Sequence, residues 1–205
     1  MTSVRLLAIT KEYGERRVLE GINADIASGS SLVVTGRNGS GKSTLLRVIA
    51  GLTRPTSGQV AIEIDGKVLA GEERRNAIGF VAPDLALYEE LTALENLAFF
   101  AKARGMRRSR KDLRELIARV DLAGREDEPL SSYSSGMKQR MKYAFALLHE
   151  APVLLLDEPT ANLDENGVAL VDEIIREHRK EGLLILATND KREVGYGDQI
   201  IQLGF

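Results

Sequence analysis

The sequence predicts an α/β fold in which a mostly parallel sheet is flanked by helices. Two runs, residues 152–156 and 183–188, are apolar nearly throughout, as expected for parallel strands that are buried on both faces. A third strand-like run, residues 31–35, leads through a glycine-rich loop into a run with apolar residues at helical spacing. The chain has 205 residues, enough for one sizeable core, so we expect a single domain over residues 1–205.

The composition is that of an ordinary globular protein, with 43% hydrophobic and 28% charged residues. Lys and Arg number 28 against 30 Asp and Glu, so no basic field favours nucleic acid or an acidic membrane surface. The absence of cysteine excludes a disulfide framework and a thiolate metal site. No apolar run approaches the roughly 18 residues of a spanning helix, so we expect a cytosolic chain that reaches a membrane only through a partner.

The N-terminal region is predicted to form an antiparallel β subdomain. Residues 4–9 and 22–26 have strand-like patterns, and residues 60–64 alternate before Asp-Gly, a dipeptide typical of a hairpin turn. Between the first two strands, residues 11–14 are expected to form a turn that places Tyr13 upstream of the glycine-rich loop. Its ring could stack on a nucleotide base, and ordinary packing is the alternative.

The glycine-rich loop, residues 36–44, matches the pattern G-x-x-x-x-G-K-[ST] at every specified position. Glycines let the backbone turn its N–H groups inward around phosphates, and the helix that follows adds a favourable dipole. Lys42 would bridge the terminal phosphates, and the Ser43 hydroxyl would bind Mg²⁺. The alternative is a glycine-rich turn with a surface lysine, but the flanking strand and helix favour a phosphate site. The expected nucleotide-binding residues of this cradle are Asn38, Gly39, Ser40, Gly41, Lys42, Ser43 and Thr44.

The middle of the chain predicts an inserted helical subdomain at about residues 88–150. Thr92 and Ser109 each stand three residues before an acidic residue, the spacing of a capping box, and an apolar stripe follows each of them. A third helix begins after Ser134, where a helix N-terminus suited to an anion is expected, although a simple cap has the same pattern. The apolar residues near the start of this region are candidates for a docking surface or for core packing. They are Leu85, Leu87, Tyr88, Phe99 and Phe100.

The strand at residues 152–156 leads directly into two acids, Asp157 and Glu158. A buried parallel strand with this ending delivers both carboxylates to the sheet edge where α/β proteins bind ligands. Asp157 would hold Mg²⁺ through its water shell, and Glu158 would face the attacking water. A helix cap after a core strand is the alternative, and the phosphate loop elsewhere in the chain favours the catalytic interpretation.

The phosphate loop, the segment from Ser134 to Gly136 and the strand with its two acids occur in an order and spacing that resemble the ATP-binding cassette (ABC) family of transport ATPases. The resemblance covers essentially the whole chain. Residues 133–140 look most like the ATPase subunits of bacterial exporters, including the haem-exporter subunits of cytochrome c maturation. The family resemblance implies a P-loop NTPase core and a head-to-tail dimer that binds ATP between the cradle of one copy and residues 134–136 of the other.

The resemblance also implies roles for individual residues. Tyr13 matches the aromatic residue that stacks on the base, and Glu158 matches the general base. Ser134 and Gly136 match the residues that contact the γ-phosphate held by the partner. Asp164 falls in the loop that communicates between the two sites.

Two positions depart from the family pattern. Where the family usually has a glutamine that contacts Mg²⁺ and senses the transmembrane partner, this chain has Pro83 followed by Asp84. Either Asp84 contacts the metal through water, or the segment serves only in coupling. Where the family usually has a histidine on the γ-phosphate, this chain has Asn189, which can donate a hydrogen bond but cannot carry a proton. We therefore expect slower ATP hydrolysis, with Glu158, Lys42 and Asn189 as the catalytic residues.

These patterns together predict an ATP-binding and ATP-hydrolysing subunit of an ABC transporter that acts with ATP and Mg²⁺. Its expected partners are a second copy of itself or a related ABC subunit and an integral membrane transporter subunit, at the inner face of the cell membrane. No nucleic acid partner is expected. The alternatives are a soluble ABC-type regulator, a cassette that binds ATP but hydrolyses it poorly, and a P-loop kinase with a small acceptor.

Overall fold

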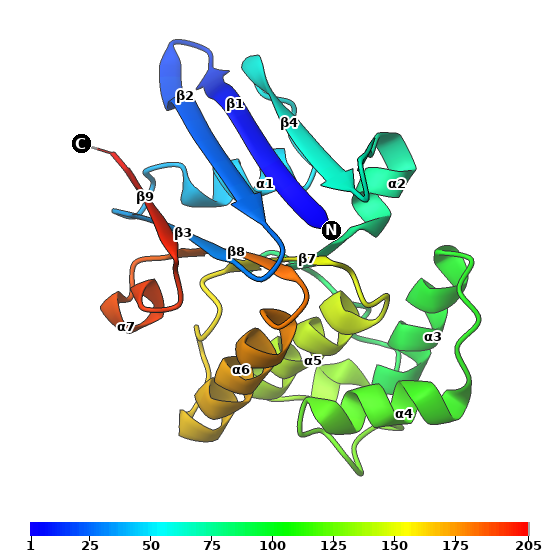
Figure 1. Ribbon diagram of the computed structural model, residues 1–205. Coiled ribbons are helices and arrows are strands. Elements are labelled where there is room, and N and C mark those ends of the chain that lie inside the picture. The colour runs from blue at the N-terminus through cyan, green and yellow to red at the C-terminus, as the bar shows by residue number, and fades with distance from the viewer. Residues whose placement is uncertain (205) are drawn as a thin grey trace.

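The computed structural model describes residues 1–204, which form two sheets and a set of helices (Figure 1). The antiparallel sheet consists of β1 (Thr2–Tyr13), β2 (Arg16–Ala27), β4 (Ser57–Ile64) and β5 (Lys67–Val68). The parallel sheet consists of β3 (Ser31–Gly36), β6 (Ile78–Val81), β7 (Val153–Asp157), β8 (Leu183–Thr188) and β9 (Gln199–Leu203). The helices are α1 (Lys42–Ile49), α2 (Gly71–Asn76), α3 (Ala93–Ala103), α4 (Arg110–Arg119), the 3₁₀ turn η1 (Leu130–Ser132), α5 (Ser135–Leu147), α6 (Glu165–His178) and α7 (Lys191–Val194).

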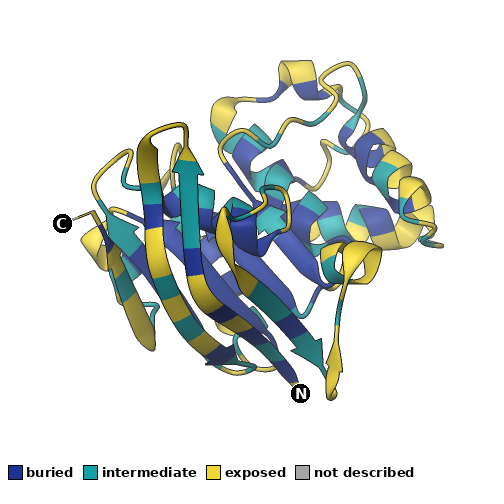
Figure 2. Cartoon of the chain, turned by 90° about the horizontal axis from the view of Figure 1, so that it is seen from above, coloured by how far each residue is buried: buried dark blue, intermediate teal, exposed yellow. Residues whose placement is uncertain are grey.

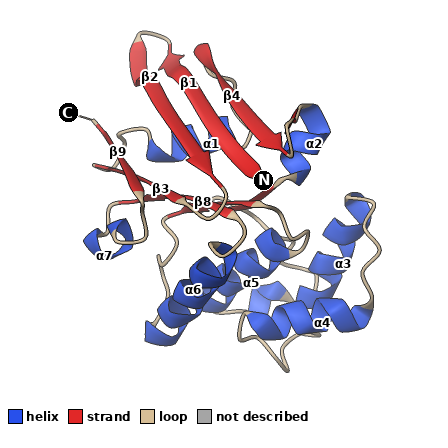
Figure 3. Cartoon of the chain, viewed as in Figure 1, coloured by secondary structure: helices blue, strands red, loops and turns tan. Residues whose placement is uncertain are grey.

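The elements are stacked in layers. Helix α1 lies between the antiparallel sheet and the parallel sheet, and α3, α4, α5 and α6 lie on the other side of the parallel sheet (Figures 1 and 3). Each face of the parallel sheet therefore has its own hydrophobic core. The predicted fold class is confirmed: a P-loop core of parallel strands and helices carries an antiparallel β subdomain and a helical subdomain.

The parallel sheet has the strand order β6-β7-β8-β3-β9, and all of its neighbouring strands run in the same direction. Ala187 of β8 lies beside Val34 of β3 on one side and beside Asp157 of β7 on the other. Strand ends that lie side by side bring the segments that follow them to one edge of the sheet. The glycine-rich loop, the two acids and Asn189 therefore meet there.

Strand β7 explains the uninterrupted apolar run in the sequence. Val153 and Leu155 face the core around α1, whereas Leu154 and Leu156 face the core beneath α5 and α6. Both faces are covered, so the side chains that point to either face leave water on folding. Strands β7 and β8 are buried along their whole length, and the buried strands appear dark blue across the centre of the molecule in Figure 2.

The two predicted capping boxes are confirmed. At the start of α3, the backbone N–H of Glu95 donates to the Thr92 hydroxyl at 3.1 Å and the Glu95 carboxylate accepts from the Thr92 N–H at 2.9 Å. Ser109 and Asp112 repeat the arrangement at α4. An N-cap of this kind stabilises a helix by about 1 kcal/mol, which fixes where both helices begin.

The prediction of a turn at residues 11–14 is wrong for residues 11–13, which belong to a strand. Strand β1 continues through Tyr13, and the chain turns only at residues 14 and 15. Pairing across the hairpin holds the strand end, because Glu12 lies opposite Arg17 and forms an ion pair with it at 2.8 Å. A polar run that pairs with a neighbouring strand has no signal of its own in the sequence.

Helix α2 was not predicted, because it has no apolar stripe and none of its residues is buried. Its anchor is Arg74, whose guanidinium donates to the backbone oxygens of Val48 at 2.9 Å and Ile49 at 2.7 Å. These carbonyls belong to the last turn of α1, where a helix leaves backbone oxygens to be satisfied from outside, and that of Val48 also accepts from the N–H of Gly51 at 3.1 Å. Over residues 1–204, no helix has both the length and the apolar character that crossing a membrane requires.

Candidate functional site: a phosphate cradle and two carboxylates

The cradle loop takes a backbone course that only glycine tolerates at two positions. Gly41, at φ 103°, is the residue before α1, and an added Cβ would lie 2.8 Å from both Cγ1 and the backbone oxygen of Val18. A Cβ at Gly36, at φ 149°, would collide with the backbone oxygen of Leu203. The loop is therefore packed from outside and leaves its concave side free.

Lys42 is the first residue of α1 and is buried, with 5% of its surface exposed. Its ammonium Nζ donates to the backbone oxygen of Gly36 at 2.9 Å and lies 3.7 Å from Oε1 of Glu158. A buried ammonium needs compensating negative charge, and here one carboxylate and a carbonyl supply part of it. The side chain thus folds back over the loop, where a phosphate would meet it.

Asp157 is 1% exposed, and neither of its carboxylate oxygens accepts a hydrogen bond from the described residues. Burial raises the pKa of this carboxyl, and the nearby Ser43 hydroxyl and the charges of Arg47 and Lys42 partly offset the rise. An unpartnered buried carboxylate is costly unless a cation binds it. A carboxylate beside a hydroxyl is also the donor type that Mg²⁺ prefers, so Asp157 and Ser43 fit a magnesium ion.

The described residues contain no group of three or more His, Asp or Glu side chains that could enclose a metal ion by themselves. A divalent cation at Asp157 and Ser43 would need most of its ligands from phosphate and water. This is the usual situation of Mg²⁺ at nucleotide sites, where the ion keeps several waters and binds through one or two protein groups.

Glu158 follows Asp157 with φ 51°, a left-handed conformation that is uncommon outside glycine. Its own N–H donates to the backbone oxygen of Ala187 at 2.9 Å. The next two residues are held by hydrogen bonds from α5 and α7. The buried Tyr143 hydroxyl of α5 donates to the backbone oxygen of Pro159 at 2.7 Å. The buried Glu193 carboxylate of α7 accepts from the backbone N–H of Thr160 at 3.2 Å and also from its hydroxyl.

Burial raises the pKa of the Glu158 carboxyl, and the charge of Lys42 opposes that rise. The negative charges of Asp157 and Glu193 act in the same direction as burial. A carboxyl with a raised pKa is a stronger base when ionised, which suits a group that takes a proton from water.

A cavity of about 480 Å³ lies over the cradle and gathers most of the expected site residues. Its lining consists of Tyr13, Arg16, Val18, Asn38, Gly39, Gly41, Lys42, Ser43, Thr44 and Glu158. Tyr13 is 52% exposed at the rim, with the Lys11 ammonium 4.7 Å from the ring centroid. The tyrosine therefore presents a free ring face beside the cradle.

Asn189 and Ser40 lie at the cradle loop but do not belong to this lining. Asn189 reaches the cradle through a hydrogen bond from its amide nitrogen to Oδ1 of Asn38 at 2.9 Å. Ser40 lies on the other side of the loop, and its buried hydroxyl oxygen has no hydrogen-bond partner among residues 1–204. Ser40 thus lines a neighbouring cavity and not the one over the cradle.

Ser134 and Gly136 lie at the start of α5 and are not part of the cavity over the cradle. The Ser134 hydroxyl caps α5 by accepting from the N–H of Met137 at 3.2 Å, and Ser134 itself is exposed. Asp164 caps α6 and accepts from the guanidinium of Arg140 at 2.9 Å. Within one chain, Ser134, Gly136 and Asp164 thus take no part in the cavity over the cradle.

The segment that carries Pro83 and Asp84 leaves β6 next to the site. The Asp84 carboxylate accepts from the Arg47 guanidinium of α1 at 2.8 Å. The Lys142 ammonium of α5 donates to the backbone oxygens of Ala82 at 3.1 Å and Pro83 at 2.7 Å. In this structure Asp84 is thus engaged by an arginine.

Sequence patterns did not reveal Arg16, Tyr143 or Glu193 as parts of the site. Arg16 donates to the backbone oxygen of Gly39 at 3.2 Å, and the other two hold the segment after Glu158. No local signal marks these residues, because each contact joins segments 16 to 33 residues apart. A buried glutamate in a short polar helix is visible only once the fold is known.

The fold and the cradle define a P-loop protein, and the comparisons identify the family. Residues 19–161 match the family model described as ABC transporter. The chain belongs to the ABC transporter family.

Relatives with curated descriptions are similar over most of this chain. An uncharacterized ABC transporter ATP-binding protein of Mycobacterium tuberculosis is 38% identical over 91% of this chain and 59% of its own length. The daunorubicin resistance ATP-binding protein DrrA3 of Streptomyces coeruleorubidus is 36% identical over 94% of this chain and 61% of its own length. The cytochrome c biogenesis ATP-binding export protein CcmA of Brucella abortus is 37% identical, with coverages of 87% and 81%. The chain spans about three fifths of the length of the first curated relatives it matches.

Solved structures show the same fold. A dimeric post-hydrolysis state of an ATP-binding cassette bound to ADP and Pi superposes with a TM-score of 0.85 at 29% identity, covering 98% of this chain and 94% of that one. A bacterial Atm1-family ABC exporter with ATP bound matches with a TM-score of 0.83 at 26% identity, covering 98% of this chain and 37% of that one. The expected family is therefore confirmed.

Proposed function

We propose that this protein is the ATP-binding and ATP-hydrolysing subunit of an ABC transporter and passes the energy of ATP to a separate membrane subunit. The observation that carries the proposal is the convergence at one sheet edge: the buried Lys42 ammonium lies 3.7 Å from Glu158, and the neighbouring Asp157 carboxylate is buried without a partner. A magnesium triphosphate supplies the charges that this arrangement is missing.

In the proposed complex, the triphosphate of ATP lies in the cradle of residues 38–44 and the base stacks on Tyr13. The backbone N–H groups of the loop and the Lys42 ammonium bind the phosphates, while Ser43 and Asp157 hold Mg²⁺. When bound, Mg²⁺ neutralises the charge that builds up on the transferring phosphoryl group. The open cavity beside Tyr13 supports this placement.

Hydrolysis in this proposal uses Glu158 as the general base. Its carboxylate orients water against the γ-phosphoryl group and accepts its proton, and its raised pKa suits that role. Lys42 stabilises negative charge on the γ-phosphate, and Asn189 donates a neutral hydrogen bond to it. Asn189 is already directed to the cradle by Asn38, which supports a contact at this position.

The proposed active unit is a head-to-tail dimer with a second copy or a related ABC subunit. Ser134 and Gly136 lie outside the cavity over the cradle, so each could meet the nucleotide of a partner. A relative of the same fold has been solved as a dimer. The start of α5 would then supply a helix dipole and a hydroxyl to the γ-phosphate from across the interface.

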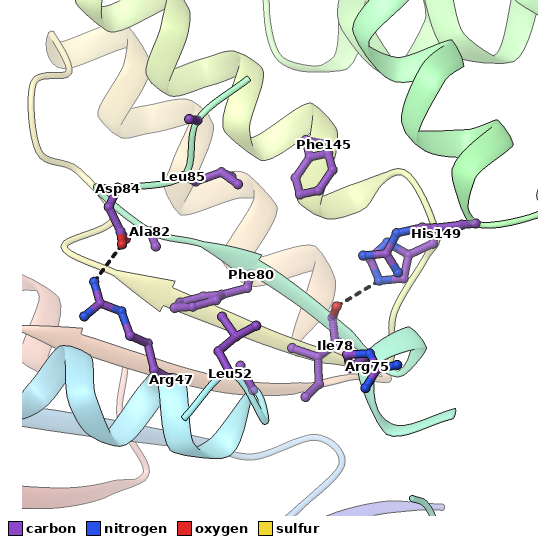
Figure 4. Close-up of a pocket in the computed structure, with 13 residues that line it drawn as sticks. Arg47, Leu52, Arg75, Ile78, Phe80, Ala82, Asp84, Leu85, Phe145 and His149 are labelled. Atoms are coloured by element: carbon purple, nitrogen blue, oxygen red, sulfur yellow. Dashed lines mark hydrogen bonds and ion pairs between the residues drawn. The ribbon is translucent and has the colours of Figure 1, made fainter. Parts of the chain in front are cut away.

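The proposed membrane partner is an integral transporter subunit, which would place this protein at the inner face of the cell membrane. A groove of about 360 Å³ opens between α1 and the helical layer (Figure 4). Its apolar lining includes Leu52, Ile78, Phe80 and Phe145, and Tyr88 and Phe99 extend an exposed aromatic surface from Phe100 nearby. We assign this groove to an amphipathic segment of the membrane subunit, because its apolar floor is bordered by three arginines, Arg47, Arg75 and Arg104, against one acid, Asp84.

The proposal is tested by measuring ATP binding and hydrolysis with purified protein and by isolating the protein from detergent-solubilised membranes. Mg-ATP should bind and be hydrolysed, Lys42→Ala should abolish binding, and an integral membrane protein should co-purify. If the purified protein neither bound nor hydrolysed Mg-ATP, ATPase activity would be excluded. A protein that binds Mg-ATP yet never accompanies a membrane protein would exclude the transporter role.

A cassette that binds ATP and hydrolyses it poorly is a second candidate, because Pro83 and Asn189 replace the glutamine and histidine of the family pattern. Pro83 offers neither a side-chain donor nor an N–H, and Asn189 cannot carry a positive charge. Single-turnover hydrolysis separates the two: an ATPase clears its bound ATP within one dimer cycle, whereas a binding cassette retains it.

A further inference from the structure

The end of the hairpin between β1 and β2 lies against the cradle loop. Arg16 of β2 donates from its guanidinium to the backbone oxygen of Gly39 at 3.2 Å. Two residues further along the strand, Val18 lies so near Gly41 that a Cβ added there would be 2.8 Å from its Cγ1. Residues i and i+2 of a strand project to the same face, so this face of β2 packs on the loop.

Tyr13 and Arg16 form a cross-strand pair at the end of the hairpin. They lie directly opposite each other, and the chain turns through residues 14 and 15 between them. Directly opposite residues of an antiparallel pair project their side chains to the same face, with Cβ atoms about 5 Å apart. Both side chains accordingly line the cavity over the cradle. Arg16 is therefore next to the tyrosine and in contact with the loop.

Arg16 brings a positive charge to this cavity without a carboxylate to balance it. Lys42, the other cation of the lining, lies 3.7 Å from Glu158. Arg17, the next residue, does not line the cavity and forms ion pairs with two glutamates at 2.8 and 2.7 Å. Within residues 1–204, Arg16 forms no ion pair, and its hydrogen bond goes to a neutral carbonyl. A guanidinium carries five N–H donors, so donors remain for an anion in the cavity.

The position of Arg16 indicates which part of a nucleotide it would meet. In the proposed complex the base lies on Tyr13 and the terminal phosphates lie at Lys42. The groups between these two ends are the ribose and the α-phosphate, and of these only the α-phosphate is charged. We propose that Arg16 binds the α-phosphate of the bound nucleotide. The inference rests on the proposed function, because the places of the base and of the terminal phosphates are taken from it.

A contact with the α-phosphate has a definite consequence for the reaction. Hydrolysis of ATP to ADP leaves the α-phosphate unchanged, so the contact persists from substrate to product. The proposed contact of Asn189 with the γ-phosphate, by contrast, is lost when phosphate leaves. An interaction that is equally strong before and during the reaction lowers KM without raising kcat. Arg16 therefore adds affinity for ATP and ADP alike and does not select between them.

The first experiment measures the dissociation constants of Mg-ATP and Mg-ADP by calorimetry and those of AMP and adenosine by competition with ADP. Arg16→Gln should raise the constants of ATP, ADP and AMP by a similar factor, about three- to tenfold, the scale of one charged hydrogen bond at an exposed site. Adenosine has no phosphate and should bind unchanged. Arg17→Gln removes the same charge from the adjacent residue outside the cavity, so it is the matched control and should change none of the four constants.

The pattern across the four ligands decides the interpretation. A loss confined to ATP, or to ATP and ADP, would place Arg16 on the γ- or β-phosphate and overturn the proposal. An equal loss for adenosine would show that Arg16 acts only by holding Tyr13 in place, which overturns it as well, as do four unchanged constants. Circular dichroism melting curves identify a variant that fails to fold. If it is R16Q, Arg16→Ala takes its place in the same four titrations.

A second experiment measures steady-state ATP hydrolysis by the same variants. In R16Q the KM should rise while kcat stays within about twofold of the wild type, because the lost contact is uniform along the reaction. A fall in kcat with an unchanged KM would mean that Arg16 acts on the reacting phosphate, which contradicts the proposal. Wild-type protein that binds no Mg-ATP at all fails the proposed function itself, whereas wild-type binding that R16Q leaves unaltered fails this inference alone.

Discussion

The N-termini of α1 and α5 are two helix starts with the same chemistry and different surroundings. At α1, Lys42 is buried with its ammonium 3.7 Å from Glu158, and contacts from α5 and α7 hold the two residues that follow Glu158. At α5, Ser134 is exposed, and its hydroxyl accepts a hydrogen bond from the N–H of Met137 in its own helix. The cradle at α1 is completed by other parts of the same chain, whereas the exposed Ser134 has no such neighbours in the cavity over the cradle. This difference supports the proposed dimer, in which each chain would contribute half of two sites.

The largest effect is expected at the cradle beside α1, from a change at Glu158. Glu158→Gln should lower the ATPase rate by about 10²–10⁴-fold, the usual contribution of a general base, because an amide cannot accept the proton from water. ATP binding should persist, since Lys42 and the cradle are untouched. Steady-state phosphate release measures the loss, and Glu165→Gln at the exposed start of α6 is the control. A variant that keeps most of its activity would remove Glu158 from the reaction.

A change at the start of α5 should lower the ATPase rate without weakening nucleotide binding to single chains. Ser134→Glu places a carboxylate where the γ-phosphate of a partner would lie, and we expect the ATPase rate to fall by about 100-fold, comparable to losing a transition-state donor. Nucleotide binding to single chains should stay the same. Ser109→Glu alters an equivalent serine cap at α4 and controls for the lost cap. Equal loss of nucleotide binding in Ser134→Glu would place the residue in the cradle of its own chain.

Asp157 gives a stability prediction with a definite sign. Its folded-state pKa is raised by burial, so ionisation destabilises the nucleotide-free fold above that pKa, and the penalty disappears as the pH falls below the unfolded value near 3.8. Asp157→Asn should stabilise the nucleotide-free protein at pH 7 by about 1–2 kcal/mol, the cost of an unpaired buried group. Melting curves at pH 7 and pH 4 test this, because the gain should shrink at the lower pH. Asp157→Asn should also abolish the stabilisation of the fold by Mg-ATP.

The smallest effect concerns Asn189. Asn189→His restores a side chain that can carry positive charge toward the γ-phosphate, and we expect a rise of about two- to fivefold in the ATPase rate of the intact transporter, the scale of one exposed charge interaction. Gln59→His, an amide-to-histidine change on the exposed surface of the antiparallel sheet, should change nothing. An unchanged rate in Asn189→His would show that the asparagine is not what slows hydrolysis.

The same two regions show what a sequence can reveal. The cradle, the two acids and the caps of α3 and α4 were all predictable, because each depends on residues within a few positions of one another. The parallel strands were predictable because burial on both faces leaves an uninterrupted apolar run. The strand order and the long-range contacts of Tyr143 and Glu193 were not, since they arise only when distant segments pack.

Asp84 and α2 are two features whose contacts could not be predicted from the sequence. The sequence showed that Pro83 could not serve as the family glutamine does, but it left two roles open for the next residue. Only the fold shows that Asp84 pairs with Arg47 on the helix that begins at the cradle. Similarly, α2 is anchored by Arg74 on the end of α1 and has no apolar pattern that could have predicted it.

The central claim is that Lys42, Asp157 and Glu158 bind one magnesium triphosphate that the α5 start of a second copy then covers. Light scattering of Glu158→Gln with and without Mg-ATP tests it most directly. The account predicts that the measured mass doubles only when both ATP and Mg²⁺ are present and that Lys42→Ala in the same background stays monomeric. A Glu158→Gln protein that binds Mg-ATP and remains a monomer at every concentration would contradict it.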